Sequence, residues 1–238
     1  LGVEMPLESV PLIQKESVKK SLKLSKPVII ATQMMESMME NITPTRAEVN
    51  DVANAVMDGA DAVMLSGETS VGKNPEEVVK IITRIINEVE NSYSNLYNQE
   101  EEPTENHERF ITDSICFNAC RLAKRVQAKA IITMTHSGYT AFKISSQRPK
   151  SSIFVFSKNK KLLSSLSLVW GVQTFYYDKM VSTDDTISDI TLFLKTNGLV
   201  EFGDLIINTA SMPISNAGKT NMLKLCLLYT SPSPRDIR

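Results

Sequence analysis

The sequence predicts an α/β fold in two segments, and three observations support this fold class. Short apolar runs rich in β-branched residues, which are typical of buried parallel strands, alternate with stretches that have apolar residues at helical spacing. An acidic stretch without large apolar residues, Asn98–Glu108, divides this alternation into a shorter and a longer segment. The 238 residues correspond to one or two domains at roughly 150 residues per domain.

Two strand–helix pairs account for the first segment. Pro27–Thr32 is expected to form a strand, and Thr45 with Glu48 three residues later has the spacing of a capping box that begins a helix. Ala60–Leu65 is expected to form the second strand, and Pro75 is expected to be the first residue of the next helix. The apolar faces of these helices are marked by Val49, Val52, Ala53 and Val56, and by Val78, Ile82, Ile85 and Val89.

The second segment continues the same alternation, which is typical of parallel α/β folds. Strands are expected at Ala130–Thr135, Ser152–Ser157, Val172–Tyr177, Leu205–Ala210 and Asn221–Leu225. Helices are expected around Ile115–Val126, from Tyr139 onward, over about Lys160–Val169 and around Ile187–Leu194.

Composition argues against several classes of protein. Lys and Arg total 26 against 27 Asp and Glu, so the net charge of −1 does not favour a general nucleic-acid binder. No apolar run approaches the roughly 18–20 residues of a membrane-spanning helix. The three Cys are typical of a reduced, intracellular chain rather than a disulfide-rich one. Because the chain has two His, we do not expect a His-rich metal site.

Both ends of the chain are unusual. It begins with Leu1 and Gly2 rather than with Met, which suggests the interior of a longer protein. The final stretch, Cys226–Arg238, resembles the translation of a transposase adapter used in sequencing libraries. A genuine Ser/Pro-rich tail is the alternative, and in either case we expect the fold to end before Cys226.

The first candidate site lies where the two strands of the first segment end, because chemistry in parallel β/α folds collects at the carboxyl ends of strands. Thr32 ends one strand, and Ser66 begins the string Ser-Gly-Glu-Thr after the other. Hydroxyl groups at these positions can bind an anion or pass a proton. No His or Lys stands there to activate them, and the simpler interpretation is that both side chains satisfy backbone groups.

The second candidate site is Thr135–Thr140, between a strand and a helix. Free N–H groups and the positive dipole end make a helix N-terminus suitable for a phosphate or carboxylate. Plain capping by Ser137 is the alternative. Elsewhere, we expect Cys116 and Cys120 to be core residues rather than metal ligands.

Taken together, the motifs resemble those of pyruvate kinases. The match is strong over about Leu1–Glu90 and looser over Phe110–Leu225. The strings that carry it are Leu1-Gly2-Val3-Glu4, Lys26-Pro27-Val28-Ile29, Ala31-Thr32-Gln33-Met34, Pro44-Thr45-Arg46-Ala47-Glu48, Asp51-Val52-Ala53-Asn54-Ala55-Val56, Asp58-Gly59-Ala60-Asp61 and Met64-Leu65-Ser66-Gly67-Glu68-Thr69.

The resemblance implies a specific architecture. Residues 1–91 would be the last strands and helices of a (β/α)8 barrel, and residues 92–225 a three-layer α/β C-terminal domain for effectors and subunit contacts. Residues 226–238 would be the adapter-derived tail. The lid domain of the family would be absent.

The resemblance also implies an activity. The family transfers a phosphoryl group from phosphoenolpyruvate to ADP, giving pyruvate and ATP in glycolysis, with Mg²⁺ and K⁺, as a cytoplasmic homotetramer. The Mg²⁺ and K⁺ ligands and the catalytic Lys of the family would lie upstream of Leu1, so we expect this chain alone to be inactive. A non-catalytic anion-binding α/β module remains the alternative; an aldolase is a weaker one, because no Lys ends either barrel strand.

Residue roles follow from the same resemblance. Thr32 would contact the substrate beside its carboxylate, and Ser66 would belong to the hydroxyl and water relay that protonates the enolate. Arg46 would lie at a subunit interface. A sugar-phosphate effector would be held by Thr135, Ser137, Gly138 and Thr140. His136 and Tyr139 replace basic residues of some regulated relatives, which leaves the effector open.

Overall fold

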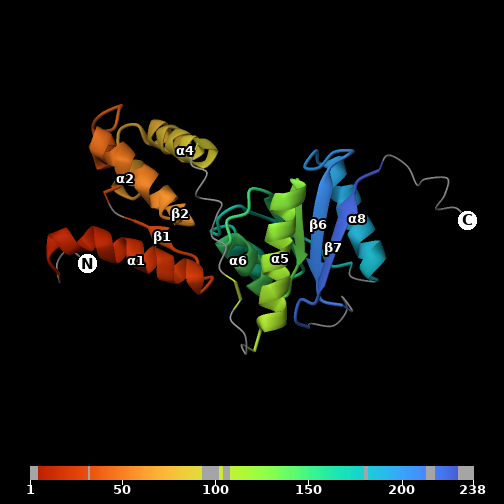
Figure 1. The fold of residues 1–238 in the computed structure, drawn as a ribbon. Helices are drawn as coiled ribbons and strands as arrows, with labels where there is room; N and C mark the ends of the chain where they lie inside the picture. Colours follow the sequence, from red (N-terminus) through yellow and green to blue (C-terminus); the bar gives the residue numbers. More distant parts are fainter. Residues whose placement is uncertain are drawn as a thin grey trace, which may run out of the picture. The chain divides into compact units, whose positions relative to one another are not determined.

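The computed structural model describes residues 5–31, 33–92, 102–103, 108–179, 182–212 and 218–229. The chain divides into two compact units. Unit 1 comprises Leu1–Gln99 with Leu168–Trp170, and unit 2 comprises Glu100–Ser167 with Gly171–Arg238. Figure 1 shows the helices and strands of each unit.

A short parallel pair of strands organises unit 1. β1 (Ile29–Ile30) pairs with β2 (Ala62–Val63), so that both strands end at the same edge. The remaining elements of the unit are η1 (Leu7–Ser9), α1 (Val10–Lys23), η2 (Glu36–Met39), α2 (Arg46–Met57), α3 (Gly67–Ser70) and α4 (Pro75–Ser92). The strands are shorter than the sequence predicts, because only these residues have ladder partners in the described part of the chain.

The capping box at the start of α2 is confirmed. The Thr45 hydroxyl accepts a hydrogen bond from the Glu48 N–H at 3.3 Å, and the Glu48 carboxylate accepts one from the Thr45 N–H at 2.7 Å. These two bonds satisfy donors that a helix start otherwise leaves free. Gly59 follows the helix with a φ of +95°, a conformation that favours glycine.

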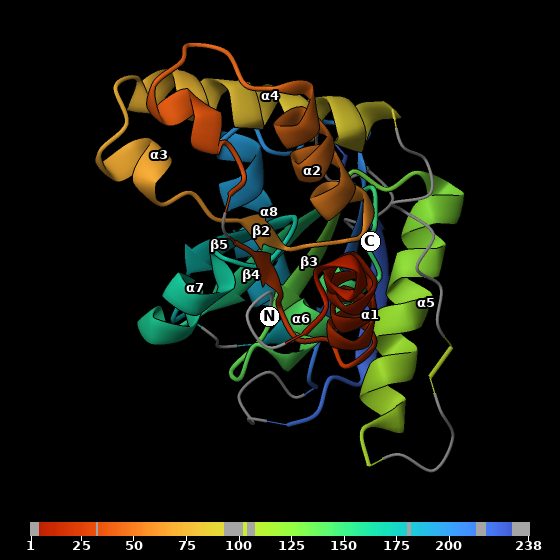
Figure 2. The same cartoon turned by 90° about the vertical axis from the view of Figure 1, so that its left-hand side faces the viewer.

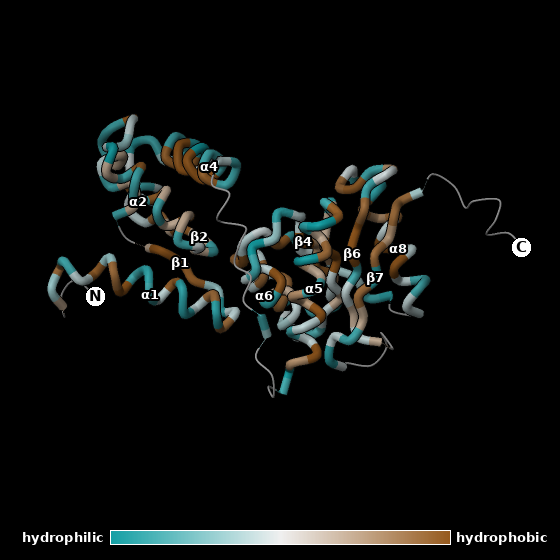
Figure 3. Tube along the Cα trace, viewed as in Figure 1, coloured by the Kyte–Doolittle hydropathy of each residue, from teal (hydrophilic) through white to brown (hydrophobic). Residues whose placement is uncertain are grey.

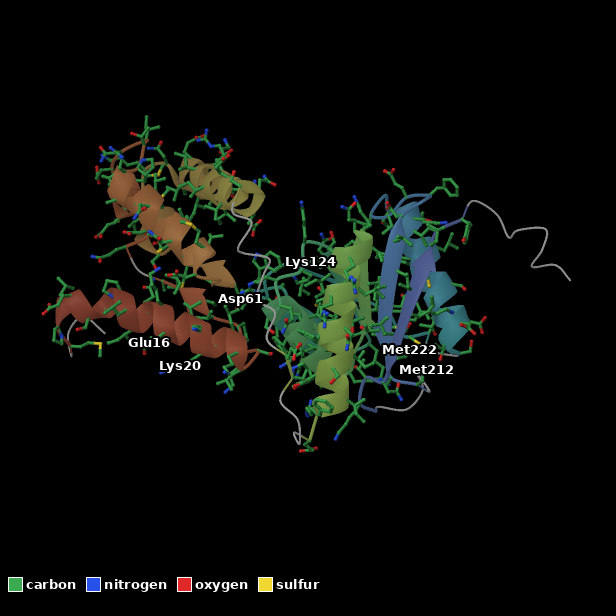
Figure 4. The ribbon with its side chains drawn as sticks, in the orientation of Figure 1. Glu16, Lys20, Asp61, Lys124, Met212 and Met222 are labelled. Atoms are coloured by element: carbon green, nitrogen blue, oxygen red, sulfur yellow. The ribbon has the colours of Figure 1, made fainter. Side chains whose placement is uncertain are left out.

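Helix α1 was not predicted from the sequence. Val18 and Leu22 are its buried residues, so its apolar periodicity is weak. Glu16 and Lys20 lie one turn apart on it, 3.8 Å from each other, and Figure 4 shows both side chains on the same helix. The pair is exposed and contributes little to stability.

The core of unit 1 lies between η2, α2 and α4. Met34, Met35 and Met38 are almost fully buried there and pack η2 and the loop before it onto the two helices. Val52 and Ala55 of α2 and Val78 and Ile82 of α4 complete the cluster. The predicted apolar face of α4 is the one that packs into this core, whereas in α2 the predicted Val49 is exposed and Ala55 is buried instead.

Unit 2 is built on a five-stranded sheet in the order β5-β4-β3-β6-β7. Four strands are parallel and β7 is antiparallel to β6. The strands are β3 (Ala130–Met134), β4 (Ser152–Ser157), β5 (Val172–Tyr176), β6 (Leu205–Ala210) and β7 (Met222–Leu227). The helices are α5 (Phe110–Val126), α6 (Tyr139–Ser146), α7 (Lys160–Leu166) and α8 (Thr183–Thr196).

The sheet lies between helical layers. α5 and α6 pack together on one face and α8 covers the other, as Figures 1 and 2 show. Ile187, Ile190 and Leu194 of α8 form one apolar cluster with Ile132 of β3 and Phe156 of β4. Figure 3 shows that the strands β4 and β6 are predominantly hydrophobic. This arrangement is the expected three-layer α/β domain.

Two expectations in unit 2 are wrong. α7 ends at Leu166 rather than near Val169, and the chain then turns at Gly171, whose φ is +69°. β7 also continues through Leu227, opposite Leu205, so the fold does not end before Cys226. Leu228 is buried and its N–H donates to the Asp204 carbonyl at 3.0 Å. Pairing with β6 orders these residues, whereas the rest of the adapter-like string, 230–238, lies outside the described residues.

No helix among the described residues combines the length and the apolar character needed to cross a bilayer.

Candidate active-site edge and anion-binding loop

The adjacent ends of β1 and β2 bring the first candidate site together. The Met64 N–H donates to the Ile30 carbonyl at 2.8 Å and extends the parallel ladder beyond the strands. Thr32 itself lies outside the described residues, but Gln33 directly after it has a φ of +54°. The segment after β1 and the segment after β2 therefore start from the same edge, as the sequence predicts.

Ser66 stands at this edge with an exposed side chain. It is the residue before α3, yet its hydroxyl makes no capping bond to that helix. Its N–H donates to Glu68 at 2.7 Å, and its carbonyl accepts from the Ser70 N–H at 3.1 Å. The simpler interpretation, in which the hydroxyl satisfies the backbone of the following turn, is not supported at α3.

Glu68 is the buried charge of the site, with 4 % of its surface exposed. Its two oxygens accept from two segments: Oε2 from the Ser66 N–H at 2.7 Å and Oε1 from the Met35 N–H at 3.4 Å. Burial alone raises the pKa of Glu68, but these backbone N–H groups outweigh it and hold the pKa below the ordinary value.

Glu48 is a second buried carboxylate, and its negative charge acts to raise the pKa of Glu68. It accepts from the Ser37 N–H at 2.6 Å and from the Thr45 N–H at 2.7 Å, and both hydroxyls donate to it as well. Burial raises the pKa of Glu48, and the Ser37 and Thr45 donors more than compensate, so the pKa is lowered. The Glu48 carboxylate thus joins η2 to the start of α2.

The loop after β1 also packs directly on the start of α3. A side-chain carbon added at Gly67 would lie 3.1 Å from Met39 Sδ, so glycine permits this approach. The Lys73 N–H donates to the Met39 carbonyl at 3.0 Å, and the Lys73 ammonium pairs with Glu40. η2 and α3 consequently form one packed rim beside the strand ends.

Sequence reasoning singled out Thr32 and Ser66 and predicted the capping role of Glu48, but it missed the bonds that Glu48 accepts from Ser37 and that Glu68 accepts from Met35. A carboxylate two residues after a strand-end serine is visible in the sequence, but its second backbone partner comes from another segment. Arg46 is the first residue of α2 and is exposed, a position at which a subunit contact remains a prediction.

The second candidate site is a tight turn between β3 and α6. The Gly138 N–H donates to the Thr135 hydroxyl oxygen at 2.9 Å, and Gly138 has a φ of +84°. The Thr140 hydroxyl is buried and lies 2.7 Å from that of Thr220. Ser137 is exposed. The Ser137 hydroxyl oxygen accepts from the Tyr139 N–H at 3.5 Å. The turn does bring the four predicted residues together, but all three hydroxyls make internal hydrogen bonds.

A polar cluster that the sequence did not predict supports this turn. The Arg109 guanidinium lies 4.2 Å from the ring centre of Tyr139, and the Tyr139 hydroxyl donates to Asp113 at 2.7 Å. Burial and the Asp113 carboxylate raise the pKa of Tyr139. Lys143 lies 3.3 Å from the same carboxylate. Elsewhere in unit 2, the Met212 N–H donates to the side-chain oxygen of Asn221, the residue before Met222, at 2.7 Å; Figure 4 labels both methionines.

The thiols of α5 have the core character that the sequence predicts. Burial raises the pKa of Cys116 and raises that of Cys120 to about 12, so neither is a ready thiolate. In the part of the chain that the structure describes, no group of three or more His, Cys, Asp or Glu is arranged to hold a metal ion.

Comparison with known proteins identifies the family. The model "Pyruvate kinase, barrel domain" matches residues 1–79, and "Pyruvate kinase, alpha/beta domain" matches residues 113–226. The chain belongs to the pyruvate kinase family. The partial barrel followed by an α/β C-terminal domain, inferred above from the resemblance, is thereby confirmed.

Similar pyruvate kinases are bacterial and protozoan. Those of Clostridium acetobutylicum and Corynebacterium glutamicum are each 42% identical, over 94% and 96% of this chain and 47% of their own length. A crystal structure of a pyruvate kinase from Cryptosporidium parvum has a TM-score of 0.84 at 33% identity, over 95% of this chain and 45% of that one. The chain thus spans about half the length of the curated pyruvate kinases it matches.

Proposed function

We propose that this chain supplies part of a cytoplasmic pyruvate kinase, which transfers a phosphoryl group from phosphoenolpyruvate to ADP to give pyruvate and ATP in glycolysis. The observation that carries this proposal is the exposed Ser66 side chain at the edge where β1 and β2 end, inside the region that matches the family's barrel model. Chemistry collects at this edge in β/α barrels.

Ser66 and Thr32 would act on the two ends of the substrate. Transfer of the phosphoryl group leaves an enolate that must be protonated at carbon, and the Ser66 hydroxyl, which is exposed, would pass that proton through water. Thr32, in the segment after β1, would donate a hydrogen bond beside the substrate carboxylate. Neither role requires a deprotonated hydroxyl.

Mg²⁺ and K⁺ would neutralise the charge of the transferring phosphoryl group. The described residues offer no cluster of metal ligands, so the ions would be held by the part of the enzyme that this chain does not match. Removing one preorganised electrostatic group costs ~2.7–4 kcal/mol. Removing several would cost on the order of 10 kcal/mol, so the chain alone would be inactive.

The C-terminal unit would regulate and assemble the enzyme. A sugar-phosphate effector would contact the exposed Ser137 side chain and the N-terminus of α6, while Thr135, Gly138 and Thr140 would hold the turn in shape. Arg46, exposed at the start of α2, would contact a neighbouring subunit of a homotetramer.

A hybrid enzyme tests this proposal. Residues 1–229, which include all of β7 and the buried Leu228, would be joined to the part of the Clostridium acetobutylicum pyruvate kinase that the chain does not match. Pyruvate formation would be followed with lactate dehydrogenase, with and without Mg²⁺ and K⁺. We expect turnover by the hybrid, none by the 238-residue chain alone, and a large loss in Ser66→Ala but not in Ser92→Ala on α4. A folded hybrid without turnover would refute the proposal, as would full activity of Ser66→Ala.

A further inference from the structure

We propose that Glu68 is a positioning residue that fixes the segment after β1 and Ser66 relative to each other. This inference rests on the proposed function, because Thr32 and Ser66 are the groups it would place. The observation that carries it is that one buried carboxylate accepts a backbone hydrogen bond from each of the two segments.

The chain after β1 has one anchor at Ile30 and another at Met35. The Ile30 carbonyl accepts from Met64, next to β2, and the Met35 N–H donates to Glu68. Both partners therefore belong to the chain around β2. Four residues separate the two anchors Ile30 and Met35, so the anchors hold the ends of this segment close to Ser66, whose own N–H donates to the other Glu68 oxygen.

Both oxygens of Glu68 must accept for this arrangement to hold. The carboxylate is buried and its pKa is lowered despite the neighbouring Glu48 charge, so it remains an acceptor at neutral pH. Glutamine has the same shape but only one acceptor oxygen, and its NH2 group would face an N–H donor. Alanine removes both acceptors and leaves two N–H groups without their partner.

Packing around Glu68 makes the carboxylate a rigid connection. Gly67 lies against Met39 of η2, and the Gly72 backbone is so close to the Glu68 carbonyl that an added side-chain carbon would lie 2.4 Å from it. The α3 backbone at Glu68 therefore cannot shift easily. A small displacement of reacting groups can lower a rate by roughly 100-fold, so this rigidity matters for the proposed proton transfer.

The first test does not depend on activity. Amide exchange of the 238-residue chain would be measured by NMR for Glu68→Ala, Glu68→Gln and the matched control Glu76→Gln, whose side chain is exposed on α4. We expect exchange at Met35 and Ser66 to accelerate together, about 10-fold or more in Glu68→Ala, with no change in the control. Unchanged exchange at both amides would overturn the proposal.

If Glu68→Ala does not fold, the unmodified chain still decides the question. The Met35 and Ser66 amide protons should then shift with one common midpoint below pH 4.5 as Glu68 is protonated, with Glu48 as the neighbouring titrating carboxylate. Two separate midpoints would overturn the proposal.

The second test uses the hybrid enzyme. We expect Glu68→Gln to lower kcat by roughly 10- to 100-fold with little change in KM for phosphoenolpyruvate, because positioning and not affinity is lost. The double variant Ser66→Ala/Glu68→Gln should be little slower than Ser66→Ala alone. The proposal would be overturned if the kcat losses of the two single variants multiplied in the double variant, or if Glu68→Gln left kcat unchanged. An inactive unmodified hybrid would refute the proposed function, and the exchange result would then stand alone.

Discussion

Replacing Gly138 by alanine should destabilise unit 2 more than the same change at Gly198. Both glycines have a positive φ, +84° and +66°, so both substitutions force alanine into a left-handed conformation that costs about 1 kcal/mol. At Gly138 the added carbon would also lie 2.7 Å from Leu162 Cδ1, whereas nothing lies within 4 Å at Gly198. Leu162 is half-buried and can move, so overpacking adds roughly 1–2 kcal/mol.

We therefore expect a loss of about 2–3 kcal/mol in unfolding free energy for Gly138→Ala and about 1 kcal/mol for Gly198→Ala. Native-state hydrogen exchange of the β3 and β4 amides in the whole chain measures both values. Equal losses in the two variants would show that Leu162 does not restrict the turn, and the close packing inferred for the turn between β3 and α6 would be wrong.

Three further predictions concern the carboxylates and thiols. Since the pKa values of Glu48 and Glu68 are lowered in the folded chain, their contribution to the stability of unit 1 should be complete above about pH 4.5 and should fall as the pH drops through the folded values, which urea unfolding at pH 6 to 2 would detect. An unfolding free energy of unit 1 that rises as the pH falls from 6 to 2 would contradict this. Thr45→Ala should cost about 1 kcal/mol, measured by exchange in α2, while Thr45→Ser, which keeps the hydroxyl, should cost less. Cys116 and Cys120 should react with a thiol reagent at pH 8 only when the chain unfolds; rapid labelling of the native chain at either would contradict their core role.

Where strands are buried on both faces, the sequence predicts the fold well. Ser152–Ser157 and Leu205–Ala210 have the bounds that their apolar runs predict, because a central parallel strand is apolar on both sides. α1 was missed because it buries only Val18 and Leu22, which gives too little periodicity. β7 was ended too early at Leu225, since its pairing with β6 cannot be recognised from local composition.

The candidate site was predictable only in part. Strand ends indicate Ser66 and the 135–140 turn because the rule needs nothing but the order of elements. The bond between Thr140 and Thr220 was not predictable, since the two residues are 80 positions apart. The role of Glu68 was missed for the same reason: Met35, the donor that defines this role, lies 33 residues away along the chain.

The central claim is that Ser66 carries a proton at the edge where β1 and β2 end. Hydrogen–deuterium exchange at the methyl carbon of pyruvate in D2O, catalysed by the hybrid enzyme, isolates that proton transfer from phosphoryl transfer. We expect Ser66→Ala to slow the methyl exchange much more than it slows ATP formation from phosphoenolpyruvate and ADP in a single turnover, because that phosphoryl transfer precedes protonation of the enolate. Methyl exchange that is as fast in Ser66→Ala as in the unmodified hybrid would contradict the account.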